Sequence, residues 1–566
     1  MISQNKETIV KAAKKAYKSA IFVFRRDMRL DDNTGLLYAL KHADVVYPVF
    51  IFDKKQVDPS ENKYYGSNCV QFMCESLADL ERQIKGRGGH LNLLQGGYPD
   101  IIEDLLDATQ TELVCINQDY TVYAKQRDSM IEAICHKRNV DFMSSADICL
   151  LGSEKVLEGF AGDVFFKKFT PYYNRAVNFK VRMTEECKDD NFAKDPIKLK
   201  DKIINDGGKQ FYQENDKIAV RGGRDEALKI LGEIHKMKNY DTIRNQPSLK
   251  TSMLSAYNKF GCVSIREVYY TAKTVLKEKA ETFTRQLFWR DFYYYIAFYF
   301  PHVFKGPMKA TYSMIPWEDD PIKIDAWQKG QTGCPIVDAA MRQMNITGWM
   351  PNRCRMIVSN YLIKDLHVNW QIGERYFANQ LVDYDPSQNN GGWQWSSGSG
   401  VDSQPYFRIF NPRLQMEKFD ANCDYIRKWC PELKNMTAKD IHNWETTYKV
   451  YKTTYPKPLV IHSEAKEKLI KMYKQSFNET ADPTGGNSDG EYPKKSKPTI
   501  MKKAKDTEKS SKVKDKDQEA ASDSESDEGW DSKKGNKGKG KTNKSKSPNT
   551  IDAGLGKRVK KNPPKK

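Results

Sequence analysis

The sequence lacks the features that define several common protein classes. No apolar run approaches the roughly 18–20 residues of a membrane-spanning helix, and no secretory apolar segment is present. The 11 cysteines form no C-x-x-C pair, and the 8 histidines show no metal-ligand spacing. We therefore expect reduced thiols, no bound metal, no membrane partner, and a nuclear or cytoplasmic rather than secreted protein. No G-x-G-x-x-G follows the first predicted strand, which disfavours a nicotinamide dinucleotide site.

Positive charge is distributed unevenly along the chain. The formal net charge is +18, and residues 491–566 alone hold 23 Lys and Arg against 12 Asp and Glu. The mildly basic remainder is consistent with a polyanionic partner, although ordinary solubility charge explains it equally well. Residues 477–566 are rich in Lys, Ser and Gly and poor in apolar residues, which predicts a disordered tail. Its Lys clusters fit a nuclear-import signal, a nucleic-acid-binding segment or a merely solvated tail.

Residues 20–150 predict an α/β domain with a parallel sheet, preceded by an exposed lead-in helix over 1–19. Short β-rich apolar runs are typical of strands buried on both faces, and helical patterns such as 67–89 separate them. This alternation favours a parallel sheet whose ligand crevice lies at the carboxyl ends of the strands. The predicted strands cover 20–26, 44–52, 90–96 and 112–117.

Residues 226–476 predict an all-α domain, joined to the first domain by a polar connector over 151–225. The segment 285–300 is apolar on nearly every side and is therefore expected to be a buried helix. Pro335 stands where the first turn of a helix tolerates proline, and Ser463 fits an N-cap.

Three polar-aromatic blocks stand out in this helical half. TSMLSAYNKFG (251–261) offers hydroxyl and backbone N–H groups at a predicted helix start, which suits either an anion site or an ordinary cap. GWMPNRCRM (348–356) places two arginines beside a tryptophan. In DYDPSQNNGGWQW (383–395), we expect the glycines to allow close backbone approach. An Asp of this block beside Arg355 would form a buried ion pair.

Several long segments resemble the DNA photolyase/cryptochrome family. They include FVFRRDMRLDDNTGL (22–36), FWRDFYYYIAFYFP (288–301), GCPIVDAAMRQMNITGWMPNRCRM (333–356) and NNGGWQW (389–395). The spellings WMPNRCRM and NNGGWQW most resemble class I cyclobutane pyrimidine dimer photolyases. The resemblance implies a Rossmann-like antenna domain, a helical FAD-binding domain, and a monomer that repairs cyclobutane pyrimidine dimers in damaged DNA under light.

In this family, excited reduced FAD donates an electron to the dimer, and the protein supplies positioning and electrostatics. The resemblance implies that Asn389 faces the flavin N5 atom, where a neutral amide suits a reduced ring. The full implied set of FAD contacts is Tyr240, Thr251, Ser252, Met253, Leu254, Ser255, Phe283, Arg290, Arg355, Asp383, Tyr384, Asp385 and Asn389.

The resemblance also implies that the lesion is flipped out of the duplex, as photolyases do. Aromatic walls and a few hydrogen-bonding groups would hold it, and cations would contact the DNA backbone. The implied substrate and DNA contacts are Arg244, Gln286, Trp289, Asn352, Arg353, Met356, Trp395 and Gln415.

Trp393, Trp370 and Trp317 match the tryptophan chain that carries electrons to the flavin in this family, although a single Trp is more often core packing. The segment NQDYTVYAKQRD (117–128) resembles the border of a second, light-harvesting chromophore. Methenyltetrahydrofolate, a deazaflavin or no pigment all remain open for that position.

Three residues depart from the class I pattern. Gln286 stands where a Glu is usual, Phe283 where a Trp is usual, and Met253 where an Arg is usual. A six-four photolyase is the rival enzyme, but Pro351 and Met356 replace its two histidines and leave no evident acid. A signalling cryptochrome is the other rival. The long tail favours it, whereas Asn389 disfavours the plant and insect types.

Overall fold

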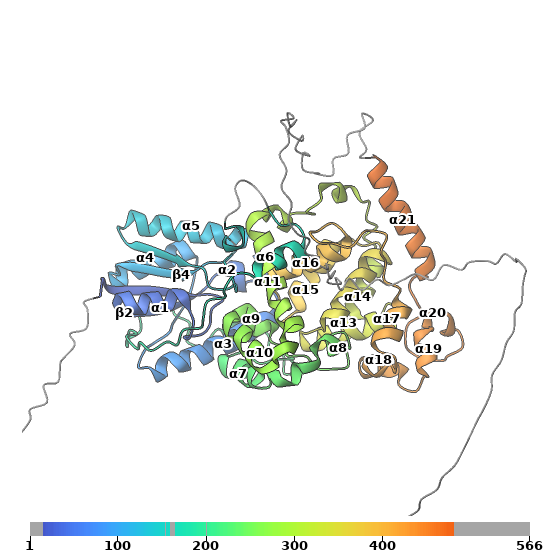
Figure 1. The fold of residues 1–566 in the computed structure, drawn as a ribbon, viewed down its shortest axis with the longest axis horizontal. Helices are drawn as coiled ribbons and strands as arrows, with labels where there is room; N and C mark the ends of the chain where they lie inside the picture. Colours follow the sequence, from blue (N-terminus) through green and yellow to red (C-terminus); the bar gives the residue numbers. More distant parts are fainter. Residues whose placement is uncertain (1–14, 153, 159–164, 200, 480–566) are drawn as a thin grey trace, which may run out of the picture. The chain divides into compact units, whose positions relative to one another are not determined.

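A five-stranded parallel sheet of order β3-β2-β1-β4-β5 forms the first part of the protein (Figure 1). The computed structural model describes residues 15–152, 154–158, 165–199 and 201–479. Residues 1–14 of the predicted lead-in helix (1–19) and residues 480–566 of the predicted tail (477–566) lie outside the described residues. The lead-in prediction is wrong from Tyr17, where the first strand begins, and the tail prediction is wrong at 477–479, which belong to the last described helix. The strands are β1 (Tyr17–Phe24), β2 (Ala43–Phe52), β3 (Asn92–Gln95), β4 (Leu113–Asn117) and β5 (Asp141–Ser145).

Four strands match the predicted runs and confirm the α/β class. β1 begins at Tyr17 rather than residue 20, because Tyr17 pairs with Ala43 and its hydroxyl donates to Asp141 at 2.7 Å. β5 was not predicted. It is an edge strand of sequence DFMSS, whose side chains are mostly only half-buried, so it lacks the continuous apolar character of the others.

Side chains alternate between the two faces of the sheet, as strand geometry requires. In β1, Phe22 and Phe24 join one hydrophobic core, whereas Ile21 and Val23 join another. Residues of α1 and α3 line the first core, and residues of α4 and α5 line the second. The helices of this part are α1 (Thr34–His42), α2 (Lys54–Val57), α3 (Ser67–Gly86), α4 (Tyr98–Thr109) and α5 (Val122–Lys137).

The described chain after residue 225 is mainly helical, as predicted, whereas the predicted connector over 151–225 is mainly irregular. One helix, α6, falls within the predicted connector, and Ser463 lies inside the first turn of α21 instead of capping it. Pro335 does begin α13. The helices are α6 (Phe169–Ala176), α7 (Arg224–Gly232), α8 (Tyr240–Ile243), α9 (Ser255–Phe260), α10 (Ile265–Leu276), α11 (Glu281–Tyr299), α12 (Pro321–Lys329), α13 (Pro335–Thr347), α14 (Asn352–Lys364), α15 (Trp370–Gln380), α16 (Pro386–Ser397), α17 (Pro412–Phe419), α18 (Asp424–Trp429), α19 (Ala438–His442), α20 (Trp444–Thr447) and α21 (His462–Glu479).

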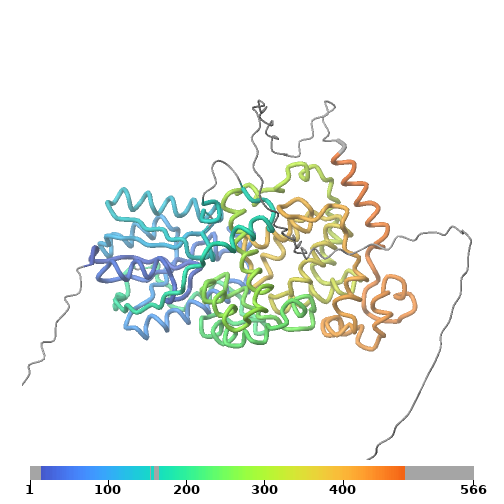
Figure 2. Tube along the Cα trace, viewed as in Figure 1, coloured from blue at the N-terminus to red at the C-terminus, as the bar shows by residue number. Residues whose placement is uncertain are grey.

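The sheet and the helices share one continuous core. Figure 2 follows the chain from the blue and cyan sheet to the green and yellow helices. Phe22 of β1 and Leu36 of α1 belong to the same buried cluster as Tyr257 of α9 and Phe292 of α11. The helical part is therefore packed directly against one face of the α/β part.

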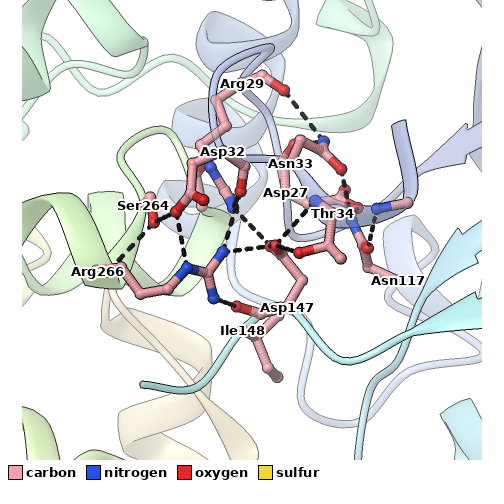
Figure 3. Close-up of polar contacts among 12 residues, drawn as sticks. Asp27, Arg29, Asp32, Asn33, Thr34, Asn117, Asp147, Ile148, Ser264 and Arg266 are labelled. Carbon is pink, nitrogen blue, oxygen red and sulfur yellow. Dashed lines mark hydrogen bonds and ion pairs between the residues drawn. The ribbon is translucent and has the colours of Figure 1, made fainter. Parts of the chain in front are cut away.

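A buried ion network ties the two parts together (Figure 3). Arg266 of α10 makes five hydrogen bonds, including 2.7 Å to the Asp32 carboxylate and 2.8 Å to the Asp147 carboxylate. Arg29 donates to the other Asp147 oxygen at 2.6 Å. Burial alone would raise the pKa of Asp147, but Arg29 and Arg266 hold it below its usual value. Each charge in this network is paired, which buried charges require.

Candidate active site around helix α16

The stretch DYDPSQNNGGWQW forms the start of a helix, not a loop. Asp385 is the N-cap of α16, and its carboxylate accepts from the backbone N–H groups of Ser387 and Gln388 at 3.0 and 3.1 Å. Pro386 follows at the first helical position, where its missing N–H costs nothing. The local sequence therefore fixes where α16 begins and which of its side chains share a face.

Two neighbouring helices approach α16 at glycines. A Cβ atom on Gly391 would lie 2.2 Å from the ring of Tyr293 in α11, so only glycine fits there. A Cβ atom on Gly373 of α15 would likewise lie 2.1 Å from the Trp393 ring. A Cβ atom on Gly392, in contrast, would meet no neighbouring atom within 4 Å. A neighbouring helix therefore approaches closely at Gly391, whereas Gly392 faces open space.

A third helix, α14, contacts α16 through a hydrogen bond between two serine hydroxyls. Ser359 and Ser396 lie 2.7 Å apart and are both buried. Asn352 and Met356 lie on the same face of α14 as Ser359, at helical spacings of seven and three residues. The predicted lesion contacts on α14 are therefore turned toward α16.

The two asparagines of α16 are both held by Glu374 of α15. Asn389 donates to the Glu374 backbone carbonyl at 2.9 Å, and Asn390 donates to its side chain at 2.8 Å. Burial raises the pKa of Glu374 to about 7, so near neutrality this carboxyl exchanges between neutral and charged forms. Glu374 was not among the predicted residues, because nothing in GERYFANQ marks its side chain as inward-facing.

Two ion pairs border α16 at its beginning. Arg355 contacts both oxygens of Asp383 at 3.0 and 2.8 Å, which confirms the expected pair. Asp385 also accepts from Arg26 and from the hydroxyl of Tyr294 at 2.5 Å. Burial would raise the pKa of Asp385, but Arg26 and Tyr294 hold it below its usual value. Arg26 was missed, since the doublet Arg25-Arg26 gives no sign of which side chain crosses to residue 385.

Polar side chains of α9 and α11 meet in one region, called the α9–α11 region below. Lys259 of α9 and Tyr293 of α11 are both partly accessible. Burial lowers the pKa of Lys259 and raises the pKa of Tyr293. Arg290 contributes to the same region, donating to the Asn258 carbonyl at 3.0 Å.

The segment before α9 has an unusual backbone. Met253 has φ 54°, which non-glycine residues rarely adopt. No side chain caps α9, and Thr251, Ser252 and Ser255 remain partly or fully accessible, whereas Leu254 is buried. Tyr240 and Phe283 meet nearby in an edge-to-face contact of 5.1 Å.

Both parts of the chain match models of one family. Residues 20–188 match the model described as DNA photolyase, and residues 283–475 match the model described as FAD binding domain of DNA photolyase. The deoxyribodipyrimidine photo-lyase of Alkalihalophilus pseudofirmus is 35% identical over 80% of this chain and 97% of its own. The Escherichia coli enzyme of the same name is 32% identical over 80% and 97%.

The chain belongs to the DNA photolyase family.

Solved structures agree with this assignment. A Sulfolobus tokodaii photolyase with two FAD molecules is 36% identical, covers 81% of this chain and 100% of its own, and has a TM-score of 0.72. An Agrobacterium tumefaciens class III photolyase is 30% identical over 83% and 100%, with a TM-score of 0.75. In the part that the structure describes, no helix is long and apolar enough to cross a membrane, and no acidic, His or Cys cluster would hold a metal.

The residues of the α9–α11 region fit the FAD that this family's domain binds. They include two cations, Lys259 and Arg290, and α9 begins without a side-chain cap. The Asn258 side-chain oxygen is buried without a hydrogen-bond partner among the described residues, as expected of a group that meets a ligand. Tyr240 and Phe283 add aromatic, largely apolar surface nearby.

The predicted lesion contacts differ in how available they are. Trp289 stacks one face on Phe169 at 3.7 Å and remains partly accessible. Gln286 turns back to the Thr282 carbonyl at 3.2 Å, and Asn352 donates weakly to the Met356 sulfur at 3.7 Å.

The predicted DNA-backbone contacts are less uniform. Arg353 is buried, with its guanidinium 2.8 Å from Asn245 and over the Phe419 ring. Gln415 is buried with its side-chain oxygen unpaired among the described residues, whereas Arg244 is partly accessible, as is Trp395.

The three predicted chain tryptophans become more accessible along their order. Trp393 is 2% exposed and Trp370 4%, while Trp317 is half-buried at the edge of their shared cluster. Trp327, which was not predicted, is fully buried and lies 6.0 Å from Trp393 in an edge-to-face contact. Trp327 was missed because α12 is largely polar in sequence, so nothing there marks this tryptophan as buried beside Trp393.

Proposed function

We propose that this protein repairs cyclobutane pyrimidine dimers in DNA under light. The observation that carries the proposal is the placement of α16. Its Asn389 is anchored by α15, and its Ser396 is registered against the α14 face that bears Asn352 and Met356. The relatives named deoxyribodipyrimidine photo-lyase, 31–35% identical over most of both chains, support the same reaction.

Bound FAD would supply the light-driven electron, and the chain's own residues would position the partners. Asn389, fixed through its amide nitrogen, would present its oxygen toward the ring without adding charge. The Arg355–Asp383 and Arg26–Asp385 pairs would hold α16 rigid beneath it. Trp289 would offer its other face to the flipped pyrimidine dimer, because Phe169 covers the first face. Trp317, Trp370 and Trp393 would connect the flavin to the surface.

A direct repair assay tests this proposal. Purified protein is mixed with oligothymidine carrying cyclobutane dimers, and separately with an oligonucleotide carrying a six-four photoproduct, under blue light and in the dark. We expect loss of the cyclobutane dimers in the light only. Repair of the six-four lesion alone would show that the six-four photoproduct, and not the cyclobutane dimer, is the substrate. Bound flavin with no repair of either lesion would indicate a signalling cryptochrome.

We propose further that the repair unit ends near residue 476 and that the basic tail serves nuclear entry or long-DNA affinity. Deleting residues 485–566 should leave repair of short oligonucleotides unchanged, since α21 and everything before it are retained. Binding to long DNA, or nuclear accumulation, should weaken. Loss of oligonucleotide repair would show that the tail is part of the active enzyme. Sedimentation of the full chain is expected to give a monomer.

A further inference from the structure

The carboxyl edge of the sheet is where an open α/β domain normally binds a ligand. The chain moves outward from β1 to β2 and β3, then returns to β4 and β5, so the strand order reverses between β1 and β4. Ligands of such sheets lie in the crevice outside the strand ends at this point. The segment 117–128, which resembles the border of a second chromophore, begins there.

In this protein the ends of β1 and β4 are bonded directly to each other. Arg25, the first residue after β1, donates to the Asn117 backbone carbonyl and to the Asp128 carboxylate. The Asn117 amide donates to Asp27 at 2.6 Å, and its oxygen accepts from the Gly35 N–H at 2.9 Å. Arg25 is 6% exposed and Asn117 3%. The mouth of the crevice is therefore spanned by protein hydrogen bonds.

The space beside this bridge is filled by a stack of side chains. The Arg127 guanidinium lies 5.0 Å from the Tyr98 ring centroid and 5.6 Å from that of Tyr123. Asp128 accepts from Arg127 at 3.0 and 2.9 Å, and Tyr123 donates to Asp53. A guanidinium is planar and stacks on aromatic faces as a pigment ring would. Arg127 thus covers the two aromatic rings against which a planar chromophore would otherwise stack.

Most members of this cluster are already hydrogen-bonded within the protein. Arg25, Asn117, Arg127 and Asp53 are buried, and each makes the bonds described above. The α9–α11 region differs, because the Asn258 side-chain oxygen there is unpaired among the described residues. A ligand entering the crevice would have to break several buried hydrogen bonds before making its own.

We infer that the crevice at the strand ends is closed by the chain's own Tyr98–Arg127–Tyr123 stack and holds no second chromophore. The Sulfolobus tokodaii photolyase, 36% identical, contains two FAD molecules. This chain departs from that stoichiometry and collects light through its single FAD, without a pigment between β1 and β4.

The test uses the full-length protein purified with its FAD. Excess FAD, FMN, a 5-deazaflavin or methenyltetrahydrofolate is added separately, free pigment is removed by gel filtration, and the denatured sample is analysed for pigment per chain. We expect one FAD per chain and no retained second equivalent. Amide hydrogen exchange over residues 117–128 should be unchanged by each addition. A second equivalent that slows exchange in 117–128 would overturn the closed crevice, and one that protects only other segments would overturn the single-FAD stoichiometry.

Opening the stack provides the complementary test. Arg127→Ala with Tyr123→Ala removes the guanidinium and one aromatic wall, and should retain several-fold more added flavin than the wild type. Arg127→Ala alone serves if the double variant does not fold, and the tightly bound FAD content monitors the native state. A folded, FAD-containing variant that gains no pigment would show that these side chains are not what closes the crevice.

Discussion

Two buried polar regions of this molecule differ in whether the protein alone pairs their charges and hydrogen-bonding groups. In the network of Figure 3, Arg266, Arg29, Asp147 and Asp32 pair with one another, and Arg266 alone makes five hydrogen bonds. Around α9 and α16, in contrast, the described residues leave the buried Asn258 oxygen unpaired and bring no cation into contact with the buried Glu374 carboxyl. The first region links the α/β part to the helical part, whereas the second keeps polar groups that a ligand could pair.

The largest effect should come from breaking the saturated network. Arg266→Ala leaves Asp32 and Asp147 buried beside fewer positive charges, which typically costs about 3–5 kcal/mol of unfolding free energy. Chemical denaturation followed by fluorescence measures this loss. The exposed Lys329–Asp325 pair supplies the control, since Lys329→Ala should leave the midpoint unchanged. Equal stability of Arg266→Ala and wild type would mean that the network does not link the two parts.

A smaller effect is expected where α11 packs on α16. Gly391→Ala places a methyl group 2.2 Å from the Tyr293 ring, and such overpacking costs about 1–3 kcal/mol. It should also weaken FAD retention on gel filtration, because Tyr293 and Arg290 share α11. Gly392→Ala is the matched control: it has open space, and alanine in a helix gains up to about 1 kcal/mol over glycine. If both variants had the same stability and retained FAD equally, the close approach at Gly391 would not contribute to the stability of the fold.

Elements that are buried along their whole length could be predicted from the sequence. Contacts between residues far apart in the chain could not. β1, β2 and β4 are predictable because both faces are apolar, whereas β5 is a half-polar edge strand. The Arg355–Asp383 pair could be foreseen because both residues lie in recognisable motifs. Arg26 contacts Asp385 across 359 positions, and Glu374 acts partly through its backbone, so neither has a local signature.

The ionisation of Glu374 should make the α16 region respond to pH. Its folded pKa of about 7 exceeds the ordinary value of 4.5, so the folded state holds the proton more tightly than the unfolded state. The stability that this proton supplies is full below pH 4.5 and is lost as pH rises through 7. Glu374→Gln cannot titrate. The stability of the wild type relative to this variant should therefore fall by about 2–3 kcal/mol between pH 5 and 8. A constant difference across that range would show that Glu374 does not carry the proton.

The smallest effect concerns Gln286, the residue that departs from the usual Glu. Its amide donates to Thr282 at 3.2 Å, which leaves the side-chain oxygen available as an acceptor on a partly accessible face of α11. Gln286→Ala removes that acceptor and should weaken binding to dimer-containing DNA by about 0.5–1.5 kcal/mol, or roughly 2–10-fold. Affinity for undamaged DNA should not change, since Gln286 carries no charge for the phosphates. Gln286→Glu keeps the acceptor and should bind the dimer at least as well as Gln286→Ala. Competition binding with matched damaged and undamaged duplexes measures both. If Gln286→Ala lost affinity for the two duplexes equally, Gln286 would contribute to the DNA surface in general and not to recognition of the lesion.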